Sequence, residues 1–189
     1  ADKFAIQTVF SHQETGIDLT FKRDLRVADF FRRKGIQWKE YLQQGVERGR
    51  KNRNRWNNLW FGFMSASLAQ PDLDRASWVK LDKKNWDEFP QNPIPEAWKV
   101  PNAQMQPGGE SKGRKYLQSF LSDRVKDYSR HISKPELSRK SCSRLSPYLA
   151  WGCLSLREVY QLSQMQAKTG KQSRNWINFQ SRLKWHCHF

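Results

Sequence analysis

The residues of this chain that are best suited to bind an anion lie in the segment 141–159. Its first loop combines a thiol, two hydroxyls and a guanidinium in five consecutive positions: Cys142, Ser143, Arg144, Leu145 and Ser146. We expect Ser146 to cap a short helix that has Pro147 at its first position. The amides at a helix N-terminus carry partial positive charge, Arg144 adds a full charge, and serine hydroxyls can donate to phosphate oxygens. The segment fits a phosphate-binding loop, and an ordinary capped helix has the same pattern.

The last part of the chain holds a second group of residues that could bind a ligand. A helix is predicted from about Asn175, with aromatic and cationic side chains interleaved along it: Trp176, Phe179, Arg182, Lys184, Trp185 and His186. Such a helix suits a surface that stacks a base and neutralises phosphates. A core helix with basic outer positions would look the same, so both interpretations stay open.

The loop at residues 142–146 resembles the flavin-diphosphate loop of the photolyase/cryptochrome family, which reads Thr-Ser-Arg-Leu-Ser-Pro-Tyr-Leu before a small-residue turn and a second Ser-capped helix. The chain agrees at ten positions: Ser143, Arg144, Leu145, Ser146, Pro147, Tyr148, Leu149, Gly152, Ser155 and Arg157. It departs at Cys142, where threonine is usual and where a thiol is the weaker donor. The resemblance implies that Cys142, Ser143, Arg144, Leu145 and Ser146 bind the phosphates and ribityl region of FAD.

The last helix resembles the family's Trp-x-x-Glu-Leu-x-Trp-Arg helix. Phe179 falls on the first Trp, Arg182 on the Glu, Trp185 on the second Trp and His186 on the Arg. The resemblance implies a cofactor contact for Phe179 and DNA contacts for Arg182, Trp185 and His186, with Trp185 packed against a flipped pyrimidine dimer. A guanidinium cannot accept the hydrogen bond that a carboxylate accepts, so Arg182 argues against ordinary cyclobutane-dimer recognition.

A third cofactor contact is implied for Tyr128, which matches a tyrosine that lies against the flavin in the family. It follows a helix predicted to begin at Glu110, in a Gly-Gly-Glu sequence like the one that opens the family's flavin-binding domain. Apart from the resemblance, a tyrosine at a helix end is as well explained as a capping or core residue.

The elements that must position these residues fall into three parts, 1–69, 70–107 and 108–189. The first part has a buried strand over 4–10, an amphipathic helix over 19–34 stopped by Gly35 and a short strand at 36–38, which is a βαβ unit. The second is rich in proline and is expected to be a connector. We therefore expect an α/β plus all-α protein: the C-terminal end of a Rossmann-like parallel α/β domain, a long connector, and the first helices of the helical FAD-binding domain.

Two features of residues 1–69 can each be interpreted in two ways. In the family the α/β domain can hold an antenna pigment, whereas His12 and Glu14 are better explained by hydrogen bonds at a loop end. The run from Arg48 to Arg55 holds five cations and could follow a phosphate backbone or form a solvated surface. After it, Trp56 and Trp60 begin a stripe that predicts a buried helix face.

Composition limits the classes of partner. The formal net charge is +16, and residues 110–189 hold 16 Lys and Arg against 5 Asp and Glu. With nine Trp, this favours nucleic acid over a solvated basic face or an acidic membrane. The three cysteines lack CxxC spacing, and signal and membrane-spanning segments are absent, so a soluble cytoplasmic protein without disulfides is expected. Adjacent His186, Cys187 and His188 would diverge on a helix, so no metal site is expected.

The resemblance implies a blue-light-dependent FAD flavoprotein, and specifically a DNA photolyase that splits pyrimidine dimers. The alternative is a cryptochrome photoreceptor, which binds FAD and signals through a partner without repairing DNA. Both share the loop around Arg144. The chain starts in a strand and stops in a helix at Phe189, so we expect a fragment that is inactive alone and belongs to a parent lyase.

Overall fold

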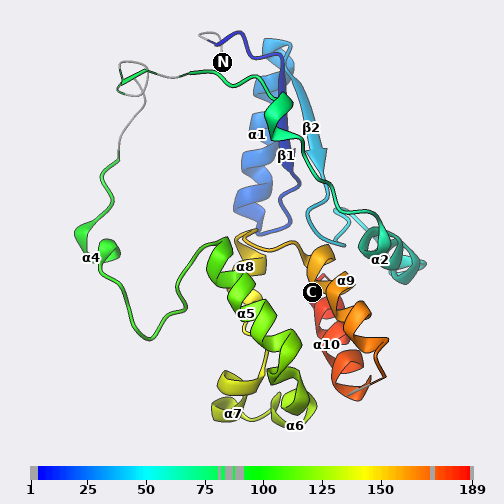
Figure 1. The fold of residues 1–189 in the computed structure, drawn as a ribbon. Helices are drawn as coiled ribbons and strands as arrows, with labels where there is room; N and C mark the ends of the chain where they lie inside the picture. The colour runs from blue at the N-terminus through cyan, green and yellow to red at the C-terminus, as the bar shows by residue number, and fades with distance from the viewer. Residues whose placement is uncertain (1–3, 81, 84–86, 88–91, 171–172, 188–189) are drawn as a thin grey trace. The chain divides into compact units, whose positions relative to one another are not determined.

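A computed structural model describes residues 4–80, 82–83, 87, 92–170 and 173–187 (Figure 1). The chain divides into two compact units, one formed by residues 1–66 with 109–189 and the other by residues 67–108. Each unit is described by itself. His188 lies outside the described residues.

The N-terminal part of the larger unit is a βαβ motif. Strand β1 (Thr8–His12) pairs in parallel with β2 (Gln37–Tyr41), and α1 (Asp18–Lys34) connects them. Gly35 ends α1 in the left-handed conformation, with φ 67°, and donates its amide to Arg32 O, as expected for a C-terminal glycine. The predicted helix and βαβ order are confirmed.

The first strand differs from its prediction. It begins at Thr8 instead of residue 4, and the side chain of Phe10 is 63% exposed instead of buried. Among the described residues β1 pairs with β2 alone, and Phe10 lies stacked on Tyr41 at 6.4 Å between ring centroids. An apolar strand sequence therefore does not produce a buried strand here, because burial depends on neighbouring elements that no local pattern encodes.

Helix α2 (Trp56–Ser65) belongs to the core of the same unit. Its predicted stripe is buried at Trp56, Trp60 and Met64, while Leu59 is exposed. The Trp60 ring meets Tyr160 edge-on, with centroids 5.0 Å apart. Gln161 Nε2 then donates to the carbonyls of Met64 and Ala66 at 2.9 and 2.8 Å, which satisfies acceptors that the end of α2 leaves without helical partners.

The C-terminal part of the unit is helical. Its elements are α5 (Glu110–Ser122), η3 (Arg124–Asp127), α6 (Tyr128–His131), α7 (Pro135–Ser141), α8 (Ser146–Ala150), α9 (Leu156–Ala167) and α10 (Ser173–His186). Helices α9 and α10 lie side by side (Figure 1). Ser155 caps α9 by accepting from Glu158 N at 3.4 Å, so the predicted Ser-capped helix is confirmed.

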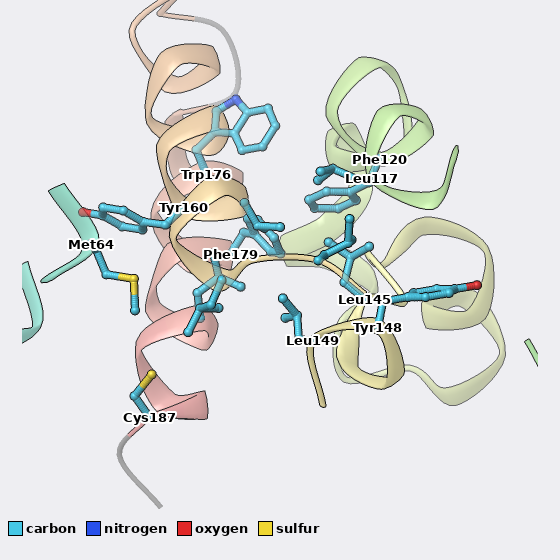
Figure 2. Packing of buried hydrophobic residues seen from close by; sticks show 14 of the residues in the cluster. Met64, Leu117, Phe120, Leu145, Tyr148, Leu149, Tyr160, Trp176, Phe179 and Cys187 are labelled. Atoms are coloured by element: carbon cyan, nitrogen blue, oxygen red, sulfur yellow. The ribbon is translucent and has the colours of Figure 1, made fainter. Parts of the chain in front are cut away.

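Aromatic side chains form the centre of the helical core. Phe120 lies 4.6 Å from Phe179, 5.6 Å from Tyr128 and 6.0 Å from Trp176 between ring centroids. Figure 2 shows Phe120 and Phe179 turned toward each other from different helices, with Leu145 and Leu149 entering the same cluster. The loop at residues 142–145 is thereby attached to the core that α5 and α10 build.

The smaller unit, residues 67–108, includes the short helices η2 (Leu73–Arg75) and α4 (Glu96–Lys99). No described helix is long and apolar enough to cross a lipid bilayer. The described residues also contain no group of three His, Cys, Asp or Glu side chains placed to hold a metal ion.

Candidate functional site

The loop between α7 and α8 differs from its prediction in how the second helix begins. The residue before α8 is Leu145, with φ −92° and ψ −12°, and Ser146 is already the first helical residue. No side-chain hydrogen bond caps this helix, and the side chain of Ser146 is exposed. The prediction of a Ser146 cap with Pro147 at the first position is therefore wrong by one residue. Leu145, which is 1% exposed, fixes the start of the helix by packing into the core.

Arg144 adopts the left-handed backbone conformation, with φ 59°. A residue with a Cβ atom adopts this conformation at a cost of about 1–2 kcal/mol, so neighbouring contacts must hold it there. Burial of Leu145 on one side is one such contact. The loop therefore fixes the direction in which Arg144 leaves the backbone.

The second contact comes from Arg124, a residue that sequence reasoning missed. Its guanidinium donates to the carbonyls of Cys142, Ser143 and Tyr116, the last at 2.6 Å. It also lies 5.8 and 5.7 Å from the ring centroids of Tyr116 and Phe120. Through these hydrogen bonds Arg124 connects the candidate loop to α5. No motif predicts this, because the partners are main-chain atoms 18 and 19 residues away.

Two cations lie close together at this loop. Burial lowers the pKa of Arg124, and the nearby charge of Arg144 also lowers it. Even so, an arginine side chain keeps its charge at neutral pH. Burial raises the pKa of the Cys142 thiol, so this side chain stays protonated and can act only as a weak donor. The loop therefore presents positive charge together with the hydroxyls of Ser143 and Ser146, a donor set that suits phosphate oxygens.

Tyr128 and Phe179, each implied by the resemblance to contact the cofactor, lie together within the core. They are 4% and 2% exposed, and their rings meet edge-on with centroids 5.6 Å apart. Burial raises the pKa of the Tyr128 phenol. Both rings contact Phe120, so in this chain they support the cluster beneath the loop. A cofactor contact for either residue stays a prediction.

Helix α10 has a buried face and a partly exposed face, so its core role is confirmed and a role in binding nucleic acid stays a prediction. Trp176, Phe179 and Leu183 are buried in the core. On the other face the guanidinium carbon of Arg182 lies 4.0 Å from the ring centroid of Trp185, whose side chain is 46% exposed. This cation–aromatic pair is accessible to an external ligand.

His186, near the end of α10, is half-buried. Its Nδ1 atom is buried and has no hydrogen-bond partner among the described residues. Burial lowers the pKa of the imidazole, which favours the neutral form. A neutral, half-buried imidazole is poorly suited to bind phosphate by charge, so a DNA contact by His186 stays a prediction without electrostatic support.

The cations of the basic run at 48–55 differ in whether they bind carboxylates. Arg48 donates to both carboxylate oxygens of Glu40, at 2.8 and 2.9 Å, and to Asp24 at 3.2 Å. Arg50 binds Glu47 and the Asn52 carbonyl. These two arginines therefore form contacts within the fold.

At the loop before α1, Glu14 accepts a hydrogen bond from the Gly16 amide at 2.7 Å, which agrees with a loop-end role.

The end of the run meets α10, which sequence reasoning did not predict. Lys184 Nζ lies 5.5 Å from the ring centroid of Trp56. Both residues line a cavity of about 290 Å³, together with Arg53, Asn57, Ser181 and Trp185. Residues about 130 positions apart in the sequence therefore form one basic and aromatic surface.

Comparisons with known proteins place this fold in a class. No protein-family model matches the chain, and no curated protein matches it. The fold, helical with a small parallel sheet, is photolyase-like. Among solved structures, the chain is similar to a bacterial class III photolyase from Agrobacterium tumefaciens, with a TM-score of 0.66 and 19% identity. The match covers 98% of this chain and 40% of that one, so the chain spans less than half the length of that photolyase.

Proposed function

We propose that this chain is part of a blue-light-dependent FAD flavoprotein, a DNA photolyase that splits pyrimidine dimers. The observation that carries the proposal is the loop that holds Ser143, Arg144 and Ser146, in which Arg124 donates to the Ser143 carbonyl and lies near the charge of Arg144. The fold agrees, because a solved structure of the same fold is named a class III photolyase. A flavin needs a firmly held diphosphate to fix its ring system, and contacts from Arg124 and the buried Leu145 anchor this loop to the core.

The residues present fit the diphosphate of FAD. Arg144 would bind a phosphate through its guanidinium, which presents paired donors to paired oxygens. Ser143 and Ser146 would donate their hydroxyls, and Cys142 would contribute a weak donor or only its backbone. Arg124 would keep the loop in shape from the opposite side. When bound, FAD would supply the light-excited electron that splits the dimer.

The DNA-facing part of the proposal depends on α10. The ring of Trp185 is partly exposed, and Arg182, 4.0 Å from its centroid, would share the ring with a stacked base or move aside for it. The net charge of +16 supports a nucleic acid as the partner. Pyrimidine dimers are proposed as the lesion by resemblance. The chain's arginine at position 182 leaves the carboxylate contact of that helix unfilled.

The test combines flavin binding with repair in the full-length protein. Arg144→Gln removes the charge with little change in size, and it should reduce the ratio of flavin to protein absorbance several-fold after purification. Arg139→Gln, exposed on α7, is the charge-matched control and should retain the flavin. Blue light should then remove dimers from irradiated DNA with the parent protein and not with Arg144→Gln. Equal flavin occupancy in the two variants would reject the loop assignment.

A cryptochrome photoreceptor is the second candidate, and one observation favours it. Arg182 stacks on Trp185 at 4.0 Å, so a cation covers the ring that would otherwise receive a flipped base. Flavin that stays bound while dimers persist under blue light would support signalling over repair. DNA binding without any flavin would reject both candidates and leave a basic DNA-binding protein. An antenna pigment is a further proposal that depends on the family resemblance alone.

A further inference from the structure

The surface where the basic run meets α10 carries charge that the fold does not neutralise. Neither Arg53 nor Lys184 forms a side-chain hydrogen bond or ion pair with any residue in the described ranges, whereas Arg48 and Arg50 are bound by carboxylates. Lys184 instead lies over two rings, 5.5 Å from the centroid of Trp56 and 5.1 Å from that of Phe61. Cations without carboxylate partners at a cavity wall favour an anionic ligand.

The cavity itself supports the same conclusion. The six residues that line the cavity of about 290 Å³ include Arg53 and Lys184 and no acidic side chain. A second cavity of about 260 Å³ shares Arg53 and Trp56 with the first, and the carboxylate in its wall, Glu47, is bound by Arg50. The two cavities therefore adjoin at Arg53. We call them together the run–helix groove.

The dimensions of the run–helix groove favour a polymer over a small molecule. Each cavity is slightly smaller than the roughly 300–1,000 Å³ usual for pockets that enclose a small ligand. Two adjoining cavities with cations at the junction suit successive units of an extended chain. Trp185 lies at the wall of the first cavity with 46% of its surface exposed, so part of this residue can contact a base beside Arg182.

We infer that the run–helix groove binds the backbone of a DNA strand, with phosphates on Arg53 and Lys184 and a neighbouring base on Trp185. The inference deepens the proposed function, on which it rests for DNA as the partner. The inference goes beyond the proposed function by assigning phosphate binding to Arg53, which precedes α2 and lies outside the C-terminal helical part. Because these contacts are to the backbone, they apply equally to undamaged DNA.

The test measures how salt changes the affinity for an undamaged, fluorescein-labelled 20-base-pair duplex by anisotropy. Each phosphate contact that is removed should reduce the slope of log Kd against log salt by about 1, so Arg53→Gln with Lys184→Gln should reduce it by about 2. We expect at least about tenfold weaker binding at 100 mM salt from the same relation. Arg26→Gln with Arg139→Gln removes the same charge from exposed positions on α1 and α7 and should change the slope by less than about 0.5.

The outcomes separate this inference from the proposed function. A double variant whose slope equals that of the charge-matched control would overturn the groove, whether or not flavin binds and dimers are repaired. A reduced slope in a protein that retains no flavin would support the groove and reject the photolyase. If phosphatidylserine vesicles, and not DNA, lose binding in the double variant, the ligand is a lipid surface and the inference is wrong. Arg53→Gln alone changes an exposed side chain, so it repeats the test without risk to the Lys184 packing.

Discussion

Gly45 lies so close to Trp60 that a Cβ atom at this glycine would be 2.3 Å from Cδ1 of the indole. Its carbonyl also accepts a hydrogen bond from Trp56 Nε1 at 3.2 Å. The backbone at Gly45 therefore packs directly on α2, at one wall of the core. A glycine is required here by close approach, since its φ is not in the left-handed region.

Gly45→Ala should destabilise the protein by about 1–3 kcal/mol, because Trp60 is 1% exposed and has no room to move away. Gly62→Ala is the matched control. Gly62 is inside α2 with nothing within 4 Å of its Cβ position, so alanine should stabilise by about 0.5–1 kcal/mol. Urea denaturation of the two variants measures the contrast. Equal effects in the same direction would contradict the close packing at Gly45.

Ser155→Ala should cost about 1 kcal/mol, because it removes the cap that accepts from Glu158 N. Ser146→Ala should cost less than about 0.5 kcal/mol, because that exposed hydroxyl caps nothing. If Ser146 serves FAD, the same variant should weaken flavin binding without loss of stability. Thermal unfolding and flavin titration of the full-length protein distinguish the two roles. A stability loss at Ser146 equal to that at Ser155 would show that the hydroxyl is a cap after all.

Arg124→Met should destabilise by about 2 kcal/mol and also reduce flavin occupancy, because it leaves the carbonyls of Cys142, Ser143 and Tyr116 without their donor. Arg124→Lys should recover part of the flavin occupancy, since an ammonium can reach some of these oxygens but cannot bind them as a planar fork. Arg139→Met, exposed on α7, is the control. The positioning role fails if Arg124→Met lowers stability while flavin affinity at low temperature is unchanged.

Protonation of His186 should make the free energy of unfolding depend on pH in the acidic range. Burial lowers its pKa in the folded state below the ordinary value of about 6.5, which the unfolded chain keeps. The unfolded state therefore binds more protons below pH 6.5, so the free energy of unfolding should fall as the pH drops from 6.5 through the folded pKa. His186→Gln should remove this step, and exposed His12→Gln should keep it. Urea midpoints at intervals between pH 7.5 and 4.5 provide the measurement.

Local signals explain what could be predicted from the sequence. The stop of α1 at Gly35 and the cap at Ser155 depend on residues within one turn of the helix end, so they are readable without tertiary structure. The buried face of α2 can also be predicted from the sequence, because its apolar residues recur at the spacing of a helix. These are features in which neighbouring residues decide the conformation.

The features that the sequence did not predict share a different cause. The start of α8 at Ser146 is decided by burial of Leu145, and the shape of its loop by Arg124. The run–helix groove depends on Arg53 and Lys184, 131 positions apart in the chain, lining the same cavity. Each of these involves packing between distant segments, which a motif does not encode. For that reason the family motif located the loop but not the residue that supports it.

The side chain of Gln161 joins the carbonyl end of α2 to α9, and α2 and the helices after residue 109 share one core. Residues 67–108 connect these parts along the chain without belonging to that core. Cutting the chain there separates two polypeptides whose buried surfaces still fit each other. We therefore expect a protein cut once within residues 67–108 to remain a single particle in gel filtration, because segments 1–66 and 109–189 are joined through this core as well as along the chain.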